Sequence, residues 1–327
     1  MFGRRLSHAG HSHHVGHPQP LRRRVLLTIL VAALLAGLAL LISPPHAHGN
    51  FVYWANGTTP GSIGRAKING TGANNNFITG LDQPTGVAVD SKFIYWSDGP
   101  NRNGRANLDG TGVKLDFITS GVTLPFGIAV TANSGIYWVN HIAGNDTAGH
   151  ANVDGSNPVG SFFDTGSVDV CGLAADQSFL YWLNTSGGPL AIGRALLSGA
   201  GPDPNFTPVA GAGCGVAVDG SFLYWDPGGN SIGRAPVGGG SPVPGFVPSA
   251  ATDACGVAVN SQYVFWGNLV GSPGSNLVGR ANINGNAPNP ALIAGAGQPC
   301  ALAAAPSNKI TVNSITKKKK KGTATIN

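Results

Sequence analysis

Four cysteines have the most distinctive chemistry in this sequence. Each directly precedes a short apolar segment of a repeated unit, and they are Cys171, Cys214, Cys255 and Cys300. An even number in an exported chain allows disulfides, here Cys171 to Cys214 and Cys255 to Cys300. A disulfide requires Cα atoms less than about 7 Å apart. We expect the strands that carry them to stand slightly farther apart, which favours buried free thiols. A tetrathiolate metal site is a third interpretation, but the close paired spacing of metal ligands is absent.

Residues able to transfer protons are scarce. Within residues 50–316 the only histidines are His141 and His150, and the chain contains no glutamate. The aspartates are spread through the sequence without a recognisable acid/base pair, and those that end apolar segments (Asp90, Asp176 and Asp219) suit turn caps. The sequence therefore predicts no catalytic residue, no metal ligand and no cofactor. Whether the protein is an enzyme stays open, and a binding protein is favoured.

The excess of positive charge lies at the two ends of the chain. The formal net charge is +6, but five arginines lie in the first 24 residues and five lysines at 317–321. Residues 50–316 carry ten lysines and arginines against fourteen aspartates, a net of −4. A mildly acidic body argues against nucleic acid as a partner.

The first 49 residues are typical of an export segment. A basic, histidine-rich stretch ends at Arg24 and is followed by the uninterrupted apolar run Val25–Ile42. Small residues before Asn50 favour a cleaved signal peptide, whereas 18 apolar residues also reach the lower limit for a membrane anchor through residues 25–42. Either outcome places the body outside the cytoplasm, secreted or membrane-anchored. Residues 311–327 form a lysine-rich tail, interpreted as a solvated tether.

The body is a sixfold repeat. Its six tryptophans, at 54, 96, 138, 182, 225 and 266, stand 41 to 44 residues apart, and each follows a tyrosine or, once, Phe265. Two further signatures keep step with them: Gly-Arg-Ala, as at 104–106, and Gly-Val-Ala-Val-Asp, as at 86–90. Short apolar runs such as Phe77-Ile78-Thr79 supply a fourth segment per repeat.

Four short strands in about 42 residues are the size of a propeller blade. The sequence thus predicts an all-β, six-bladed β-propeller over residues 50–310, with antiparallel blades and buried Tyr-Trp pairs. The first repeat lacks its first strand, so the C-terminal strand at 301–305 is expected to complete that blade and close the ring. Dipeptides such as Asn69-Gly70 predict two-residue type I′ turns. The Gly-Arg-Ala arginines are expected to lie along aromatic rings or to pair with aspartates.

The unit Pro84–Gly110, with Gly-Val-Ala-Val-Asp, Tyr-Trp-Ser-Asp and Gly-Arg-Ala-Asn-Leu-Asp-Gly, resembles the YWTD repeat, also called the LDL-receptor class B repeat. The resemblance covers about 255 residues and implies a six-bladed propeller that serves extracellular recognition without a cofactor. Only Tyr95–Asp98 keeps the Asp of the name motif, with Ser97 in the threonine position. Asn takes the Asp position in four other copies, and Pro227 takes it in the fifth blade. We expect a rearranged strand exit after Asp226.

Strand order places the connections from the fourth strand to the next blade, and from the second strand to the third, on one face. These connections vary in length and content, and irregular loops on a rigid frame commonly carry recognition. We therefore expect this face of a monomeric protein to bind an extracellular protein, a glycan or another cell-surface component. The alternative is a propeller-type lyase or hydrolase with a site at the channel mouth. The expected binding residues are Asp98, Asn101, Arg102, His141, Asn145, Asp146, Asn184, Asp226, Asn230 and Asn268.

Overall fold

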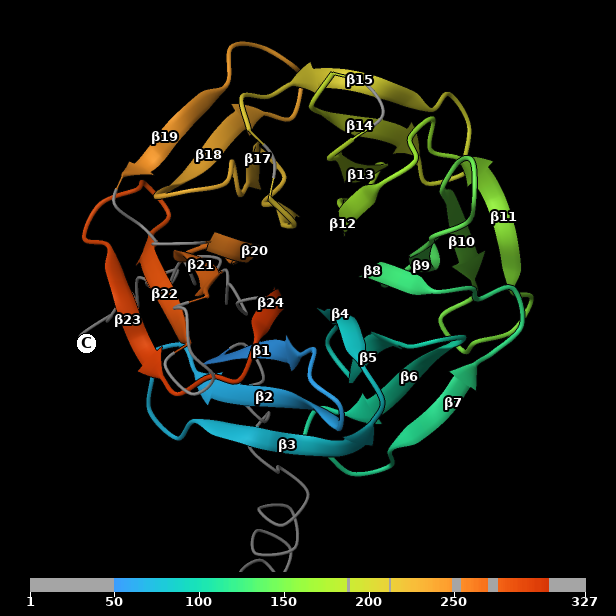
Figure 1. Ribbon diagram of the computed structural model, residues 1–327, viewed down its shortest axis with the longest axis horizontal. Helices are drawn as coiled ribbons and strands as arrows, with labels where there is room; N and C mark the ends of the chain where they lie inside the picture. The colour runs from blue at the N-terminus through green and yellow to red at the C-terminus, as the bar shows by residue number, and fades with distance from the viewer. Residues whose placement is uncertain (1–49, 187–188, 212, 249–253, 270–275, 306–327) are drawn as a thin grey trace, which may run out of the picture. The chain divides into compact units, whose positions relative to one another are not determined.

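A computed structural model describes residues 50–186, 189–211, 213–248, 254–269 and 276–305. These residues form 24 strands in six four-stranded antiparallel sheets, arranged as blades around a central axis (Figure 1). The prediction of an all-β six-bladed propeller is confirmed. The leader 1–49 and the tail 311–327 lie outside the described residues. Within the described part, no helix is long and apolar enough to span a membrane.

Each blade uses its strands in the predicted order from the axis outward. The innermost strands are β24 (Pro299–Ala304), β4 (Pro84–Val89), β8 (Pro125–Thr131), β12 (Val170–Ala175), β16 (Val216–Val218) and β20 (Ala254–Val259). The second strands are β1 (Phe51–Asn56), β5 (Phe93–Asp98), β9 (Gly135–Asn140), β13 (Phe179–Asn184), β17 (Phe222–Trp225) and β21 (Tyr263–Asn268). The third strands are β2 (Gly61–Lys67), β6 (Arg102–Asn107), β10 (Thr147–Ala151), β14 (Ala191–Leu196), β18 (Ser231–Pro236) and β22 (Leu277–Asn282). The outer strands are β3 (Asn74–Leu81), β7 (Lys114–Ile118), β11 (Val159–Asp164), β15 (Asp203–Pro208), β19 (Val243–Pro248) and β23 (Asn289–Ala294).

The ring closes where the sequence predicts. Strand β24 pairs antiparallel with β1, with Val52 opposite Ala304 and Trp54 opposite Leu302. The last described strand thus becomes the inner strand of the first blade (Figure 1). This pairing occupies the backbone groups that an open edge would expose.

The Tyr-Trp pairs form the core between blades. All six tryptophans are fully buried, as are five tyrosines and Phe265 in the slot before them. Because successive side chains of a strand point to opposite faces, each pair fills two neighbouring interfaces. Trp182, for example, packs with blade-three residues such as Tyr137 and Phe163, whereas Tyr181 packs with blade-five residues such as Trp225.

The glycine of each Gly-Arg-Ala segment lies directly against an indole ring. In the fourth blade, Gly193 is the cross-strand partner of Trp182. A Cβ atom on Gly193 would lie 2.2 Å from Trp182 Cε2, and the five equivalent glycines show the same closeness. Glycine is required here by close packing, not by a positive φ.

The arginine that follows this glycine is held between aromatic rings, as expected. The Arg194 guanidinium carbon lies 4.5 Å and 3.6 Å from the centroids of Phe179 and Phe206. Arg65, Arg105 and Arg234 are sandwiched in the same way, and Arg280 lies over Tyr263. In the third blade His150 replaces the arginine and stacks on Phe162. The arginines are therefore structural.

The predicted two-residue type I′ turns are wrong. In the first blade, Gly70 N–H donates to Lys67 O and Lys67 N–H to Thr71 O, so the turn spans 67–70. Gly70 has a φ of 86°, but Asn69 is not among the described residues with positive φ, as type I′ would require. Asn69 Oδ1 instead accepts from Thr71 N–H. Asn69 therefore does not adopt a positive φ; its side chain instead stabilises the turn through the bond to Thr71.

The expectation of free thiols is also wrong, because the inner strands approach more closely than assumed. Cys171 on β12 is disulfide-bonded to Cys214, just before β16, with Cα atoms 4.7 Å apart. Cys255 on β20 is bonded to Cys300 on β24, with Cα atoms 4.6 Å apart. The first bridge joins blades four and five, and the second joins blade six to the strand that closes the ring.

Candidate functional site

The two faces of the ring differ in regularity. On one face, all five connections from an innermost strand to the second strand contain three residues, as in 90–92 and 176–178. On the other, the connections between blades range from two residues, 82–83, to seven, 209–215. We call this second face, formed by connections between blades and between second and third strands, the loop face.

The regular face repeats one hydrogen-bonded turn. Asp176 Oδ1 accepts from the N–H groups of Ser178 and Phe179, and Asp176 Oδ2 accepts from the hydroxyl of Tyr181. Asp90 and Asp219 make the same contacts in their blades. Burial and the neighbouring carboxylate raise the pKa of Tyr181. The expected role of these aspartates as turn caps is confirmed.

Five of the ten expected binding residues lie beneath the loop face. Their side chains are buried, and they are Asp98, Asp146, Asn184, Asp226 and Asn268. Asn184 and Asn268 each donate to a backbone carbonyl of their own outer strand, Pro204 O and Pro290 O. Their bonds within the protein give these side chains a role in positioning the loops, whereas binding by them stays a prediction.

Asp98 shows how such a residue holds a loop. Its Oδ1 accepts from the N–H groups of Asp82 and Gln83, which connect blades one and two. Its Oδ2 accepts two bonds from the Arg102 guanidinium, the nearer at 2.7 Å. Arg102 also reaches Asp116 at 3.4 Å. One buried carboxylate thus ties two loop-face connections together.

Asp226 confirms the rearranged exit of the fifth blade. Strand β17 ends at Trp225, so Asp226 falls outside the ladder that its counterparts in other blades continue. Its Oδ1 accepts from Gly228 N–H, and its backbone bonds to Gly213 and Gly215. The remaining expected residues reach the surface: Asn101, Asn145 and Asn230 are exposed, and Arg102 and His141 are half-buried.

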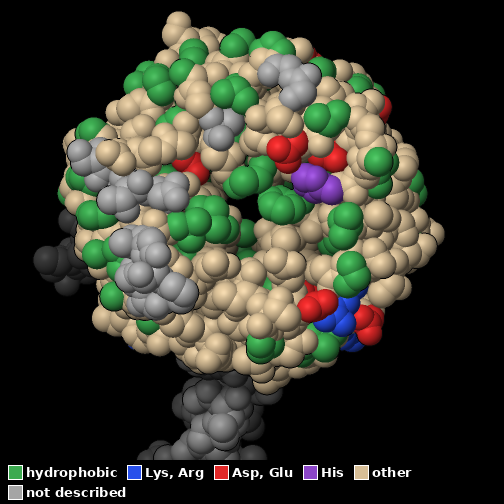
Figure 2. Space-filling model, viewed as in Figure 1, with side chains coloured by type: hydrophobic (Ala, Val, Ile, Leu, Met, Phe, Trp, Pro, Cys, Tyr) green, Lys and Arg blue, Asp and Glu red, His purple; other side chains and the backbone are tan. Residues whose placement is uncertain are grey.

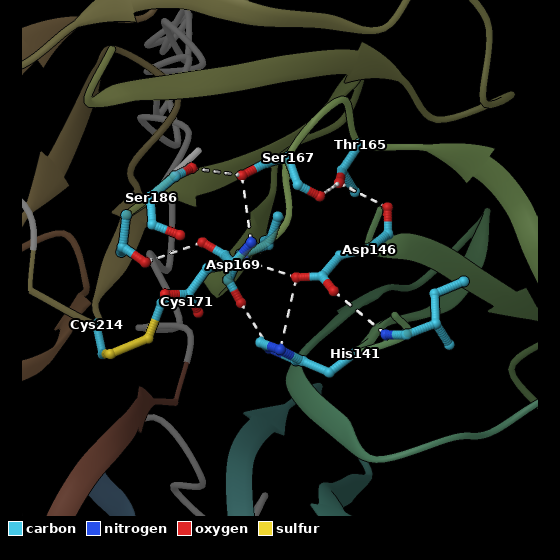
Figure 3. Close-up of polar contacts among 11 residues, drawn as sticks. His141, Asp146, Thr165, Ser167, Asp169, Cys171, Ser186 and Cys214 are labelled. Carbon is cyan, nitrogen blue, oxygen red and sulfur yellow. Dashed lines mark hydrogen bonds and ion pairs between the residues drawn. A yellow bond between two sulfur atoms is a disulfide. The ribbon is translucent and has the colours of Figure 1, made fainter. Parts of the chain in front are cut away.

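The polar centre of the loop face is formed by His141 and Asp146 in the third blade (Figure 3). Asp146 Oδ2 accepts from Val170 N–H at 2.8 Å, and His141 Nε2 lies 3.0 Å from Val170 O. Asp146 N–H donates to Ser167 O, and Asp146 O accepts from Thr165. The two side chains therefore bind loop 141–146 to the start of β12, and the backbone of Asp146 binds it to loop 165–169, next to the Cys171–Cys214 bridge.

The ring of His141 also lies close to the carboxylate of Asp146. If His141 Nε2 donates to Val170 O, then Nδ1 faces Asp146 Oδ2 at 3.5 Å. Burial raises the pKa of Asp146, and the negative charge of Asp169 raises it further. The hydrogen bond from Val170 N–H and the interaction with His141 act in the opposite direction but do not cancel the rise.

We expect Asp146→Asn to change the pH dependence of stability. A carboxyl whose pKa is raised by folding contributes stability below its unfolded pKa and loses it as pH rises through the folded value. The wild-type protein undergoes this loss as pH rises above about 4, the usual pKa of an aspartate. Asparagine still accepts from Val170 N–H and stays neutral. Urea unfolding at several pH values should show the variant gaining on wild type as pH rises, and a constant difference would contradict the prediction.

Few polar side chains line the channel mouth on the loop face. Backbone and apolar side chains line it, including Phe126, Ile128 and Leu173. Within the described ranges, no three His, Cys, Asp or Glu side chains are grouped to hold a metal ion. A hollow of about 510 Å³ lies nearer the rim, between blades one and two, lined by Pro100, Asn101 and Arg102 among others.

Sequence reasoning missed the apolar part of this face. Among the described residues, three large hydrophobic ones are exposed on it: Leu124, Ile142 and Val168. Each lies in an irregular connection, where no periodic pattern distinguishes an exposed side chain from a buried one. Figure 2 shows the histidine of this face next to hydrophobic and acidic side chains.

Comparisons with known proteins show the fold. No protein-family profile and no curated protein matches the chain. A chain from the crystal structure of a nidogen/laminin complex superposes with a TM-score of 0.61 at 18% identity, covering 78% of this chain and 97% of that one. The putative TolB of Agrobacterium tumefaciens has a TM-score of 0.57 at 13% identity (79% and 92% covered), and TolB of Acinetobacter baumannii 0.57 at 12% (79% and 67%). At these identities the chain shares their propeller fold.

Proposed function

We propose that this protein is an exported binding module that recognises a protein, glycan or other surface component through the loop face. The observation that carries the proposal is the contrast between the faces. One repeats the same capped turns, whereas the connections of the other vary in length and are braced from below by Asp98 and Asp146. Braced irregular loops suit recognition because their shape is set before a partner arrives.

Export is supported by the two disulfides, since structural disulfides persist in oxidising compartments. It agrees with the apolar run at 25–42.

We further propose that the ring is of the YWTD type, with an Asp-Tyr bond in three blades and an arginine between aromatic rings in four. The similar chain from the nidogen/laminin structure comes from a protein complex, which is the kind of role proposed here.

Photo-crosslinking in the native host tests the proposal. A photoreactive residue is placed at Asn101 or Asn230 on the loop face, and at Thr111 or Ser221 on the regular face as matched exposed controls. We expect a discrete adduct from the loop-face positions alone. Adducts from the regular face alone, or none from either face, would overturn loop-face recognition. Alkylation of free thiols in intact cells checks export. An exported protein should have all four cysteines in disulfides, so none of them should react with the reagent.

A further inference from the structure

Exposed aliphatic side chains on the loop face gather in one sector. Seven large hydrophobic residues of the described part are clearly exposed. Four of them, Val113, Val159, Leu196 and Val243, lie in or beside connections of the regular face. The other three are Leu124, at 56% exposure, Ile142 and Val168, and all lie in connections that enter, cross or leave the third blade. We call these three residues the blade-three patch.

Hydrogen bonds hold the three connections together. His141 N–H donates to Leu124 O, and Ile142 N–H to Asp146 Oδ1, both at 3.3 Å. Asp146 N–H donates to Ser167 O, directly before Val168. The Cys171–Cys214 bridge fixes the strand that follows. Little conformational freedom is left to lose on binding, which favours affinity.

Leu124 has a backbone conformation that is rare for a bulky side chain. Its φ is 42°, and the only other described non-glycine residues with positive φ are Asn157 and Ala287. Positive φ is unfavourable for a bulky side chain, and such strain is commonly kept at functional positions. Two bonds hold it in place, from Leu124 N–H to Pro100 O and from His141 N–H to Leu124 O. The strain turns an aliphatic side chain toward solvent, where it gains no burial.

The charge around the patch is acidic. Asp164, which is exposed, and Asp169, which is half-buried, lie in or beside the connection that carries Val168, and neither is in an ion pair within the described part. The only lysine or arginine that the described residues place in or beside a loop-face connection is Arg102. Asp98 and Asp116 already neutralise it. The patch thus pairs apolar surface with unmatched negative charge.

We propose that the blade-three patch docks a polypeptide segment that places a lysine or arginine beside aliphatic or aromatic side chains. The proposal rests on the loop-face function above and names the partner class for that face. Apolar side chains of the segment would cover Leu124, Ile142 and Val168, and its cation would lie near Asp164 and Asp169. A glycan fits less well, because the exposed residues are branched aliphatics without the flat aromatic faces that sugars stack on.

A defined peptide panel tests the proposal with the purified full chain. The peptides are nine residues long, with a central Lys or Arg flanked by Leu, Ile, Phe or Trp, and each has a counterpart with Glu at the centre. Binding is measured by fluorescence anisotropy. We expect the best basic peptides to bind at least about tenfold tighter than their Glu counterparts, with an affinity that falls as salt rises.

Leu124→Asn is the decisive variant, because asparagine tolerates positive φ and the fold should be kept. We expect about tenfold weaker binding with an unchanged unfolding midpoint. Asp169→Asn should weaken binding several-fold and flatten the salt dependence. The matched control is Val113→Asn, an exposed valine of the regular face that should bind as wild type does. Equal binding of Glu peptides, absence of binding in the whole panel, or wild-type binding by Leu124→Asn would overturn the proposal.

The two proposals can fail separately. If Asn101 or Asn230 crosslinks a partner while Leu124→Asn leaves that adduct unchanged, loop-face recognition stands and the blade-three patch is not its site. If no loop-face position crosslinks a partner, yet the panel binds through Leu124, the patch is a peptide site without the proposed role in the host.

Discussion

Replacing Cys255 and Cys300 together by alanine is expected to lower the free energy of unfolding by about 4 kcal/mol. The bridge closes 45 residues, and the chain-entropy model assigns about this cost to losing a loop of that length. The loss is large because the bridge closes a long loop, and it acts where β24 completes the first blade. Urea unfolding under non-reducing conditions, followed by tryptophan fluorescence, measures it.

The matched control is the double variant of Cys171 and Cys214, whose bridge closes 43 residues. The same chain-entropy relation predicts a nearly equal loss of global stability. Only the Cys255 and Cys300 variant should also loosen β24, seen as faster amide hydrogen exchange at Ala301–Ala304. Equal exchange of β24 in the two variants would show that hydrogen bonds to β1 are sufficient to hold the closure.

Gly193→Ala is expected to cost about 3 kcal/mol, the upper end of the usual range for overpacking. The new Cβ atom would lie 2.2 Å from Trp182 Cε2. The indole is fully buried between two blades and has no room to retreat. Thermal and urea unfolding measure the loss.

Gly238→Ala provides the control for this glycine. A Cβ atom on Gly238 would have no other atom within 4 Å and the φ of this residue is not positive, so the substitution should be neutral or slightly stabilising. A cost for Gly193→Ala as small as that of the control would mean that blades four and three separate easily. It would then contradict the close packing that explains the Gly-Arg-Ala signature.

The ring, its closure and its core could be predicted because burial repeats with the sequence. A Tyr-Trp pair every 41 to 44 residues requires a repeated sheet with two buried faces, and all six pairs are buried. The displaced first strand predicted the pairing of β24 with β1. The arginine after each Trp-facing glycine was expected beside aromatic rings, and lies there in five blades.

Turn type and cysteine pairing could not be predicted with the same success. Asn69-Gly70 suits several turns, and the choice among them depends on how β2 leaves the sheet. Free thiols were favoured over bridges because the distance between inner strands was overestimated. That distance follows from how closely Gly172 and Gly256 let neighbouring blades approach the axis.

The binding residues were the least predictable part. Asp98, Asn184 and Asn268 follow the Tyr-Trp slot in the same way, and they were expected to face a partner. Their polar atoms turn inward because buried backbone groups of a neighbouring connection (for Asp98) or of the outer strand (for Asn184 and Asn268) need partners once water is excluded. The exposure of Leu124, Ile142 and Val168 was not predicted, because irregular loops have no repeating pattern of buried and exposed residues.

The amino-acid sequence by itself determined the number of blades, the order of their strands, the buried aromatic pairs and the closing strand, because each of these follows from a local pattern repeated six times. Only the tertiary structure decided which cysteines bond, which polar side chains brace the loops and which aliphatic ones face solvent. These depend on distances between blades and on competition for hydrogen bonds among segments far apart in the chain, which local pattern does not encode.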